Sequence, residues 1–355
     1  MNSLPIKFLL FLTIITWISS CKGPKQTEQE ESVSVTKAMG DQVAGLAGSI
    51  WVIYQDSRGY NWYGSNGNGA YWFDGVNLWQ FTTLDGLASD QIRGIQEDKK
   101  GNIYFDTPNG VSKFNGEKFV TLIPVESTTN QWKLNPNDLW FKGNGDIQGA
   151  YRFDGDSLYQ LEFSAFGPKI SGDEYSTYSI YKDKQGHLWF GTLSAGVCRF
   201  DGTSLCWLYE HELAELEDGR VPGTRSIIED KDGHFWLSNI ISRYRINPNN
   251  ATAPEKIQYD KLKGIDPVQQ QVYMQLPYYN SAVFDEKRGD LWLTNYSEGV
   301  WKYDGKKLTH YPIKDGETDV LIISIYKDKQ GVLWLGTDNA GVFKWNGEKF
   351  EKLVF

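Results

Sequence analysis

One phrase occurs twice in the chain, and weaker copies of it occur five more times. Residues 183–192 read DKQGHLWFGT and are followed by GVCRFDG, while residues 328–337 read DKQGVLWLGT and are followed by GVFKWNG. The copies centre on aromatic residues spaced roughly 45 residues apart, which is the length of a four-stranded propeller blade. These aromatic residues are Trp62, Tyr104, Trp140, Trp189, Trp236, Trp292 and Trp334. The repeat therefore predicts an all-β, seven-bladed β-propeller of four-stranded antiparallel blades.

Each copy reads as four short strands joined by tight turns. Residues 179–182 alternate in polarity, as a half-buried strand does, and Asp183 and Gly186 then bound a hairpin turn. A second turn at Asp201-Gly202 joins the third strand to the fourth. Such a sheet has two apolar faces and cannot bury both alone, so copies stack side by side until the ring closes. We therefore interpret the repeated tryptophans as core between blades and not as ligand contacts.

Two copies bear on how regular the ring is and how it closes. In the third copy the usual turn is replaced by residues 135–138, which read NPND. In the seventh copy residues 350–355 form the fourth strand. The first and seventh blades are thus each built from one continuous segment, and we expect them to pack directly against each other.

The first 45 residues are expected to lie outside the propeller. Residues 1–20 carry Lys7 and then an apolar run from Phe8 to Ile18, which suits a signal peptide and is too short to span a bilayer. The following ISSC resembles the lipobox of bacterial lipoproteins, which predicts lipid attachment at Cys21; an ordinary secretory signal with an incidental cysteine is the alternative. Lys22 after this cysteine favours the outer membrane over the inner one.

Residues 21–45 are polar and acidic and are predicted to be a flexible tether, although Val33–Lys37 suits an edge strand as well. The propeller is assigned to residues 46–355. The expected location is the cell envelope, with membrane contact through the lipid anchor alone.

The order of strand, Asp-x-x-Gly, Leu-Trp-x-Gly-Thr and Gly-Val-x-x-Phe-Asp-Gly resembles the two-component regulator propeller repeat. The resemblance extends over roughly residues 49–355. It implies an extracytoplasmic sensor, because these repeats form the sensor part of some bacterial hybrid histidine kinases. No second apolar stretch is long enough to span a membrane, and the sequence leaves no room for a kinase after Phe355. We therefore expect a binding or sensing propeller with no fused kinase.

Charge and cysteine content limit the function further. The formal net charge of −9 argues against nucleic acid, which is bound through Lys and Arg contacts to phosphates. Of three cysteines, Cys198 and Cys206 flank the turn at Asp201-Gly202. A disulfide between them requires that the two residues lie directly opposite each other, and the sequence leaves open whether they do.

Chemical motifs are few. No metal-ligand spacing and no nucleophile motif occurs among the four histidines and three cysteines, so we expect no metal, no cofactor and no catalytic residues. His187 and His234 occupy the same repeat position and are interpreted as surface decoration. For an enzymatic alternative, His211 with Glu298 is the pair to examine.

Topology nevertheless indicates where a ligand would bind. Propellers gather the loops between the second and third strands, and those between blades, on one face around the axis. Candidate ligand-binding residues in these loops are Asn239, Asn295, Tyr296, Glu298, Asp338, Asn339, Trp132, Tyr278 and His211. Amides with aromatic rings suit carbohydrate or peptide, although asparagines also serve simply as turn formers.

Three functions remain open at this stage. The first is a lipid-anchored module that binds a glycan, a peptide or a partner protein. The second is a propeller lyase or hydrolase with a His/Glu site at the channel mouth. The third is a structural subunit of an envelope complex, which a large exposed apolar patch would favour.

Overall fold

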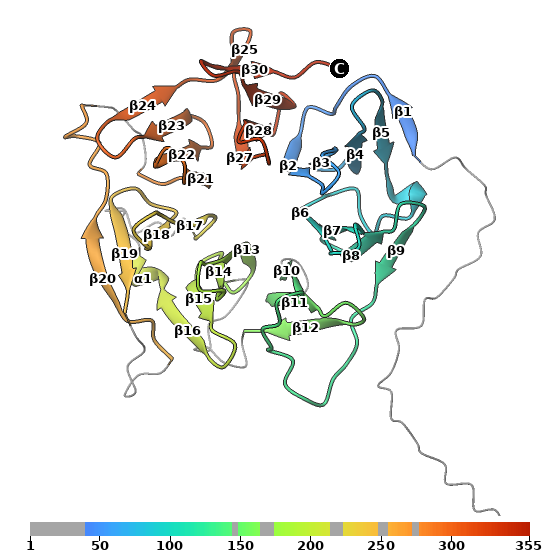
Figure 1. Ribbon diagram of the computed structural model, residues 1–355, viewed down its shortest axis with the longest axis horizontal. Coiled ribbons are helices and arrows are strands. Elements are labelled where there is room, and N and C mark those ends of the chain that lie inside the picture. Colours follow the sequence, from blue (N-terminus) through green and yellow to red (C-terminus); the bar gives the residue numbers. More distant parts are fainter. Residues whose placement is uncertain (1–39, 144–147, 164–173, 214–222, 248–254, 272–276) are drawn as a thin grey trace, which may run out of the picture.

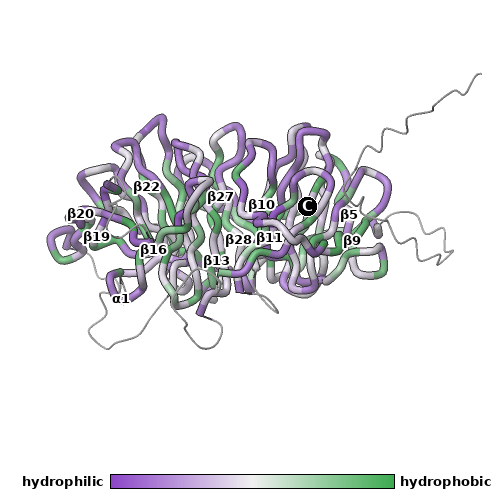
Figure 2. The backbone as a smooth tube through the Cα atoms, turned by 90° about the horizontal axis from the view of Figure 1, so that it is seen from below, coloured by the Kyte–Doolittle hydropathy of each residue, from purple (hydrophilic) through white to green (hydrophobic). Residues whose placement is uncertain are grey.

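The computed structural model describes residues 40–143, 148–163, 174–213, 223–247, 255–271 and 277–355. Seven antiparallel sheets stand side by side around a common axis (Figure 1). Seen from the edge, the ring is a disc with hydrophilic loops on both faces and apolar stretches along the strands between them (Figure 2). The predicted all-β, seven-bladed propeller is confirmed. The predicted signal peptide, residues 1–20, and Cys21 lie outside the described residues.

The blades follow one another in chain order, each beginning with its innermost strand. Blades 1 and 2 consist of β2 (Ile50–Gln55), β3 (Asn61–Ser65), β4 (Ala70–Phe73) and β5 (Leu78–Phe81), then β6 (Gly94–Glu97), β7 (Ile103–Thr107), β8 (Gly110–Phe114) and β9 (Phe119–Leu122). Blades 3 and 4 consist of β10 (Leu139–Gly143), β11 (Gly149–Phe153) and β12 (Leu158–Glu162), then β13 (Thr177–Lys182), β14 (Leu188–Thr192), β15 (Gly196–Phe200) and β16 (Leu205–Tyr209).

Blades 5 to 7 continue the same pattern. Blades 5 and 6 consist of β17 (Ile227–Glu229), β18 (His234–Leu237), β19 (Ser242–Ile246) and β20 (Tyr259–Lys263), then β21 (Ser281–Asp285), β22 (Asp290–Asn295), β23 (Gly299–Tyr303) and β24 (Leu308–Tyr311). Blade 7 consists of β27 (Ile322–Lys327), β28 (Leu333–Thr337), β29 (Val342–Trp345) and β30 (Phe350–Lys352). Short elements lie between blades: η1 (Thr83–Asp85), α1 (Glu210–Leu213) and the hairpin of β25 (Lys314–Asp315) and β26 (Thr318–Asp319).

Blade 3 departs from the four-stranded pattern. Trp140 places β10 at the position of the second strand of the other blades, and the described residues before it form no inner strand. The chain runs instead past the outer strand, where the Val125 amide donates to the Leu158 carbonyl (2.9 Å). Trp132, predicted to lie on the loop face, is buried between blades 3 and 4 against Trp140. That prediction is wrong because this segment fills the space beside the sheet.

The aspartate that opens each turn explains the repeated tryptophan. In blade 4, Asp183 Oδ1 accepts from the backbone amides of Gln185 and His187, and its Oδ2 accepts from Trp189 Nε1 (2.8 Å). Equivalent bonds join Asp56 to Trp62, Asp230 to Trp236 and Asp328 to Trp334, and in blade 2 Asp98 accepts from the Tyr104 hydroxyl. These aromatic rings are buried in the clusters between blades, as predicted.

The two cysteines of blade 4 do not form the disulfide that the sequence left open. In the pairing of β15 with β16, Cys198 lies opposite Trp207 and Cys206 lies opposite Arg199. Cys198 and Cys206 would lie directly opposite each other only if the pairing of the two strands were shifted by one residue. Neighbouring positions of a strand point to opposite faces, so Cys198 belongs to the core facing blade 3 and Cys206 to the core facing blade 5. Both cysteines are buried thiols.

The ring closes by direct packing of blade 7 on blade 1, as expected. Ile50, Ile53 and Tyr63 of blade 1 share one buried cluster with Trp334 and Val342 of blade 7. The Gly341 amide donates to the Gly48 carbonyl (2.6 Å), and Lys329 Nζ donates to the Asp56 carbonyl (2.7 Å). The two blades meet beneath the label of the C-terminus in Figure 1.

One strand lies within the range predicted to be tether. β1 (Asp41–Val43) pairs with β5 and adds a fifth, outermost strand to blade 1. The sheet therefore includes residues before the predicted boundary at residue 46, whereas Val33–Lys37 lies outside the described residues. In the part of the chain that the structure describes, neither the length nor the apolar run needed for a bilayer crossing is found in any helix.

Candidate functional site: the axial cavity

A cavity of about 750 Å³ follows the axis of the ring, and residues from all seven blades line it. Among them are Ile53, Ile95 and Ile325, which lie on the inner strands, and Tyr296 and Asp338, which lie in loops after second strands. We call this space the axial cavity. Every repeat thus contributes to this common surface.

The strand register shows that the cavity contains a ring of equivalent positions. In six blades one inner-strand residue pairs with the repeated aromatic residue, for example Gln96 with Tyr104 in blade 2. The residue three positions earlier lines the cavity in each of these blades. These residues are Trp51, Arg93, Tyr178, Arg225, Asn280 and Ile323. One level of the cavity thus carries one side chain from each of these six blades, and arginine is the type that recurs.

Blade 3 supplies a lysine where an inner strand is missing. Lys142 lies on β10 and faces the cavity, and its Nζ donates to the Arg93 carbonyl (2.8 Å). In the second strands of blades 1, 4 and 7 the equivalent position is glycine, and in blade 2 it is Asp106. Arg93, Lys142 and Arg225 therefore form a basic wall on the blade 2 to blade 5 side of the axial cavity.

Burial shifts the pKa values of the charged groups at the basic wall and of the neighbouring Asp106. Burial raises the pKa of the Asp106 carboxyl to about 6, although the charges of Lys142 and Arg93 act in the opposite direction. Burial also lowers the pKa of Lys142 and of Arg93. Asp106 Oδ2 accepts the backbone amide of Lys142 (2.9 Å), which ties blade 3 to blade 2 at this level.

The mouth of the axial cavity is organised by Asp338. Its Oδ1 accepts from Ser49 Oγ and Trp51 Nε1 (both 2.8 Å), and its Oδ2 accepts from the Tyr296 hydroxyl (3.3 Å). These bonds outweigh burial and hold the pKa of the Asp338 carboxyl below its usual value. The carboxylate thus fixes an indole and a phenol ring, from blades 1 and 6, at the entrance.

The nine predicted loop-face residues divide into groups. Tyr296 and Asp338 line the axial cavity. The side chains of Asn239, Asn295 and Asn339 bond to backbone groups and support loops: Asn239 accepts from the Ser242 amide, Asn295 donates to the Tyr278 carbonyl, and Asn339 accepts from the Leu321 amide. Tyr278 takes part through its backbone: its carbonyl accepts the bond from Asn295, and its main chain pairs with that of Asn239 in an isolated antiparallel bridge.

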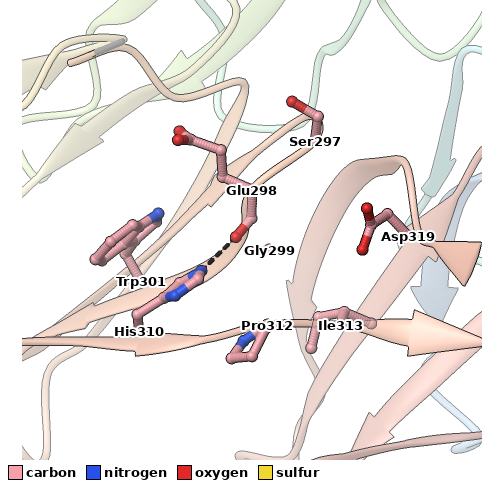
Figure 3. A pocket seen from close by; sticks show the side chains of 8 residues that line it. All are labelled: Ser297, Glu298, Gly299, Trp301, His310, Pro312, Ile313 and Asp319. Atoms are coloured by element: carbon pink, nitrogen blue, oxygen red, sulfur yellow. Dashed lines mark hydrogen bonds between the residues drawn. The ribbon is translucent and has the colours of Figure 1, made fainter. Parts of the chain in front are cut away.

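Glu298 lines a neighbouring pocket of about 380 Å³ (Figure 3). His310 donates from Nε2 to the Glu298 carbonyl and stacks on Trp301 (ring centroids 4.1 Å apart). The Glu298 carboxylate points away from the imidazole. His211 lies on α1 after blade 4 and stacks on Tyr209. The histidine beside Glu298 is therefore His310 and not His211.

Among the residues that the structure describes, one cluster of side chains has the spacing of a metal site. Asp230, Asp232 and His234 bring their ligand atoms within 4.8 Å of one another in the first turn of blade 5. Asp230 Oδ1 already accepts from two backbone amides, its Oδ2 accepts from Trp236 Nε1, and Arg243 Nη1 lies 3.6 Å from that oxygen. The carboxylate is thus the turn aspartate of this repeat, and its surroundings satisfy it without a cation.

Sequence reasoning missed most of the cavity lining. The residues that the loop positions did not include lie within or beside inner strands: Trp51, Arg93, Tyr178, Arg225 and Asn280. The repeat does contain a signal: alignment on the repeated aromatic residue brings Trp51, Arg93, Tyr178 and Arg225 into one column. Asn280 joins the column once the extra residue in the turn of blade 6 is allowed for. Lys142 is outside that column and could not be placed without knowledge of the missing strand.

Comparisons with known proteins agree with this fold. Residues 171–194 and 316–339 match the two component regulator propeller family, which confirms the resemblance. The extracellular domain of the hybrid two component system BT4673 from B. thetaiotaomicron is 20% identical, with a TM-score of 0.58 over 87% of this chain and 40% of that chain. The chain thus spans about two fifths of the length of that extracellular domain. Comparison with curated proteins gave no match.

Two other propellers are similar in structure. Virginiamycin B lyase from Staphylococcus aureus is 13% identical, with a TM-score of 0.57 over 86% of this chain and 97% of that chain. YCF48 bound to D1 peptide is 9% identical, with a TM-score of 0.55 over 88% of this chain and 98% of that chain. At these identities the likeness concerns the fold. This chain is a seven-bladed propeller similar to the extracellular propellers of two-component regulators.

Proposed function

We propose that this protein is an extracytoplasmic binding module that takes part of a glycan or a peptide into the axial cavity. The observation that carries the proposal is the cavity itself, with a mouth formed by Trp51, Tyr296 and Asp338. Ligand sites are concave and combine apolar surface with a few placed polar groups. An indole ring offers a flat face for a sugar or a peptide side chain, and the amide of Asn280 can bond to the rim of either.

The proposal places the propeller in the cell envelope, held at the outer membrane by lipid on Cys21. The sequence around Cys21 supports the anchor, and the BT4673 and YCF48 propellers support the role, since one is an extracellular domain and the other was solved with a peptide. A Cys21→Ala variant should move from the membrane fraction to the aqueous fraction and lose incorporation of labelled palmitate. Unchanged fractionation would exclude the anchor.

Binding is favoured over catalysis by the chemistry of the lining. Among the described residues that line the axial cavity there is no histidine and no cysteine. The one carboxylate in that lining, Asp338, already accepts three hydrogen bonds. General acid–base catalysis needs a group within hydrogen-bond reach of the reacting proton, and Asp338 is occupied with holding the two rings.

The proposal is tested with variants at the mouth. Trp51→Ala and Tyr296→Ala should each weaken ligand binding about tenfold or more, because each removes a ring face of the entrance. Isothermal titration calorimetry against sugar oligomers and tripeptides measures this. Leu84→Ala is the control, since Leu84 is 85% exposed on η1 and does not line the cavity. Equal affinity in all variants would place binding elsewhere and contradict the proposal.

A further inference from the structure

We infer that the ligand of the axial cavity carries a carboxylate, which the basic wall of Arg93, Lys142 and Arg225 binds. The inference rests on the proposed function, because it names the chemistry of the ligand for the same cavity. It is carried by the placement of these three cations, which come from three different blades and line one space.

The first argument is charge asymmetry. The chain has a formal net charge of −9, yet the described lining of the axial cavity has three basic side chains and one acidic side chain. The acidic one, Asp338, belongs to blade 7 and bonds to Ser49, Trp51 and Tyr296. The basic wall belongs to blades 2, 3 and 5, on the lower half of the ring in Figure 1. A concave surface with one sign of charge concentrates ligands of the opposite sign.

The second argument is the position of the Arg225 side chain. Its Cζ lies 4.5 Å from the centroid of the Tyr178 ring, which is at the equivalent position of the preceding blade. This stacking holds the guanidinium in the cavity while the residue stays exposed. A guanidinium presents paired N–H donors that match a carboxylate in a bidentate arrangement. Tyr178 therefore positions Arg225 for an anionic group at the same level as Lys142.

The third argument is the departure of blade 3 from the repeat. Without an inner strand, the second strand faces the axis directly, and a side chain can project where blades 1, 4 and 7 carry glycine. That side chain is a lysine whose ammonium lies beside Arg93. Two cations at one level repel each other, and Asp106 beneath them offsets part of that repulsion. An anion in the cavity would offset more of it.

The opposite half of the cavity defines the rest of the ligand. Trp51, Ile323 and Ile325 line the side of blades 1 and 7. The ligand should therefore carry a carboxylate at one end and a ring or apolar face at the other. Two sources share this chemistry: an acidic sugar, such as a uronate in an oligosaccharide, and an acidic side chain of a short peptide.

The experiment compares charged and neutral probes on the full chain. Calorimetric titrations at low ionic strength and neutral pH would use a galacturonate trisaccharide against a galactose trisaccharide, and a glutamate-containing tripeptide against its glutamine form. The key variant is Arg225→Gln, because Arg225 is exposed and the Tyr178 ring on which it stacks is only half-buried. The matched control is Arg288→Gln, which removes the same charge from the exposed turn after β21.

We expect one acidic probe to bind at least tenfold more tightly than its neutral counterpart, and to lose roughly ten- to a hundredfold in affinity with Arg225→Gln but not with Arg288→Gln. Raising the salt concentration should weaken this binding. Preference for the uronate or for the glutamate peptide identifies the source. Equal binding of acidic and neutral probes, unaffected by Arg225→Gln but weakened by Trp51→Ala, would overturn this inference and leave the proposed function standing. No binding of any probe would count against both.

Discussion

At the scale of single residues, the turn aspartate is the most informative group in the chain. One carboxylate receives two backbone amides of its own turn and the indole N–H of the strand that follows, as Asp328 does from Gln330, Val332 and Trp334. The turn and the core residue are thus fixed by the same side chain. A buried indole N–H needs a partner, which explains why aspartate and tryptophan recur together at a spacing of six residues.

Replacing this aspartate should therefore be costly. Asp328→Ala leaves Trp334 Nε1 and two turn amides without their acceptor in a position that is 7% exposed. We expect a loss of about 2–4 kcal/mol in the free energy of unfolding, measured by urea denaturation. Asp319→Ala, whose side chain is 73% exposed, should change stability by less than about 0.5 kcal/mol. Similar losses in both variants would refute this role.

A second prediction concerns the pH dependence of Asp106. Because burial raises the pKa of its carboxyl from an ordinary 3.8 to about 6, the protonated form favours the folded state. The stabilisation that the protonated Asp106 carboxyl gives the folded state is fully present below pH 3.8 and is lost as the pH rises through about 6. Asp106→Asn lacks this titration, so between pH 4 and 7 wild type should lose about 1–3 kcal/mol relative to the variant. Denaturation at a series of pH values measures the difference, and a flat difference would show that burial does not govern this carboxyl.

At the scale of elements, the spacing between blades depends on small residues in second strands. A Cβ added to Gly191 on β14 would lie 2.2 Å from the carbonyl oxygen of Thr224, which precedes the inner strand of blade 5. A Cβ on Gly336 would lie 2.7 Å from the carbonyl oxygen of Ile50 in blade 1. A backbone carbonyl cannot move aside as the end of a flexible side chain can. Glycine at these two positions therefore allows neighbouring blades to pack closely.

Gly191→Ala should consequently separate blades 4 and 5. We expect a loss of about 2–4 kcal/mol, seen as a lower unfolding midpoint in calorimetry. Gly45→Ala provides the control, because an added Cβ there meets nothing within 4 Å. A Gly191→Ala variant as stable as wild type would mean that the blades tolerate a wider spacing.

The repeat predicted the elements well and the site poorly, for physical reasons. Turn chemistry and alternating polarity are local, so the blades and their order could be read from one copy and extended to the others. Contacts across blades are not local. Whether Cys198 faces Cys206 depends on register, and whether Trp132 is exposed depends on where a strandless segment runs. The basic wall is distributed over three repeats and becomes visible once the ring is closed.

At the scale of the whole molecule, closure joins the two ends of the ring without exchange of strands. Blades 1 and 7 are held by a shared apolar cluster and by contacts of the last residues. The Leu353 amide donates to the Val342 carbonyl (2.8 Å), and the Phe355 ring packs on Phe73 and Tyr63, with centroids 5.0 and 6.1 Å away. The segment after β30 thus leaves blade 7 and rests on blade 1.

Removal of residues 351–355 tests whether this segment maintains the ring. The truncation deletes most of β30 and the Phe355 contacts, so we expect a loss of roughly 3 kcal/mol and a midpoint lowered by several degrees in calorimetry. Phe355→Ala alone should cost about 1 kcal/mol, since its ring is partly exposed. Lys352→Ala removes an exposed ion pair with Asp315 and should change little. If the truncated chain keeps the wild-type midpoint, closure depends on the cluster around Ile50 and Trp334 alone, and the terminal segment has no part in it.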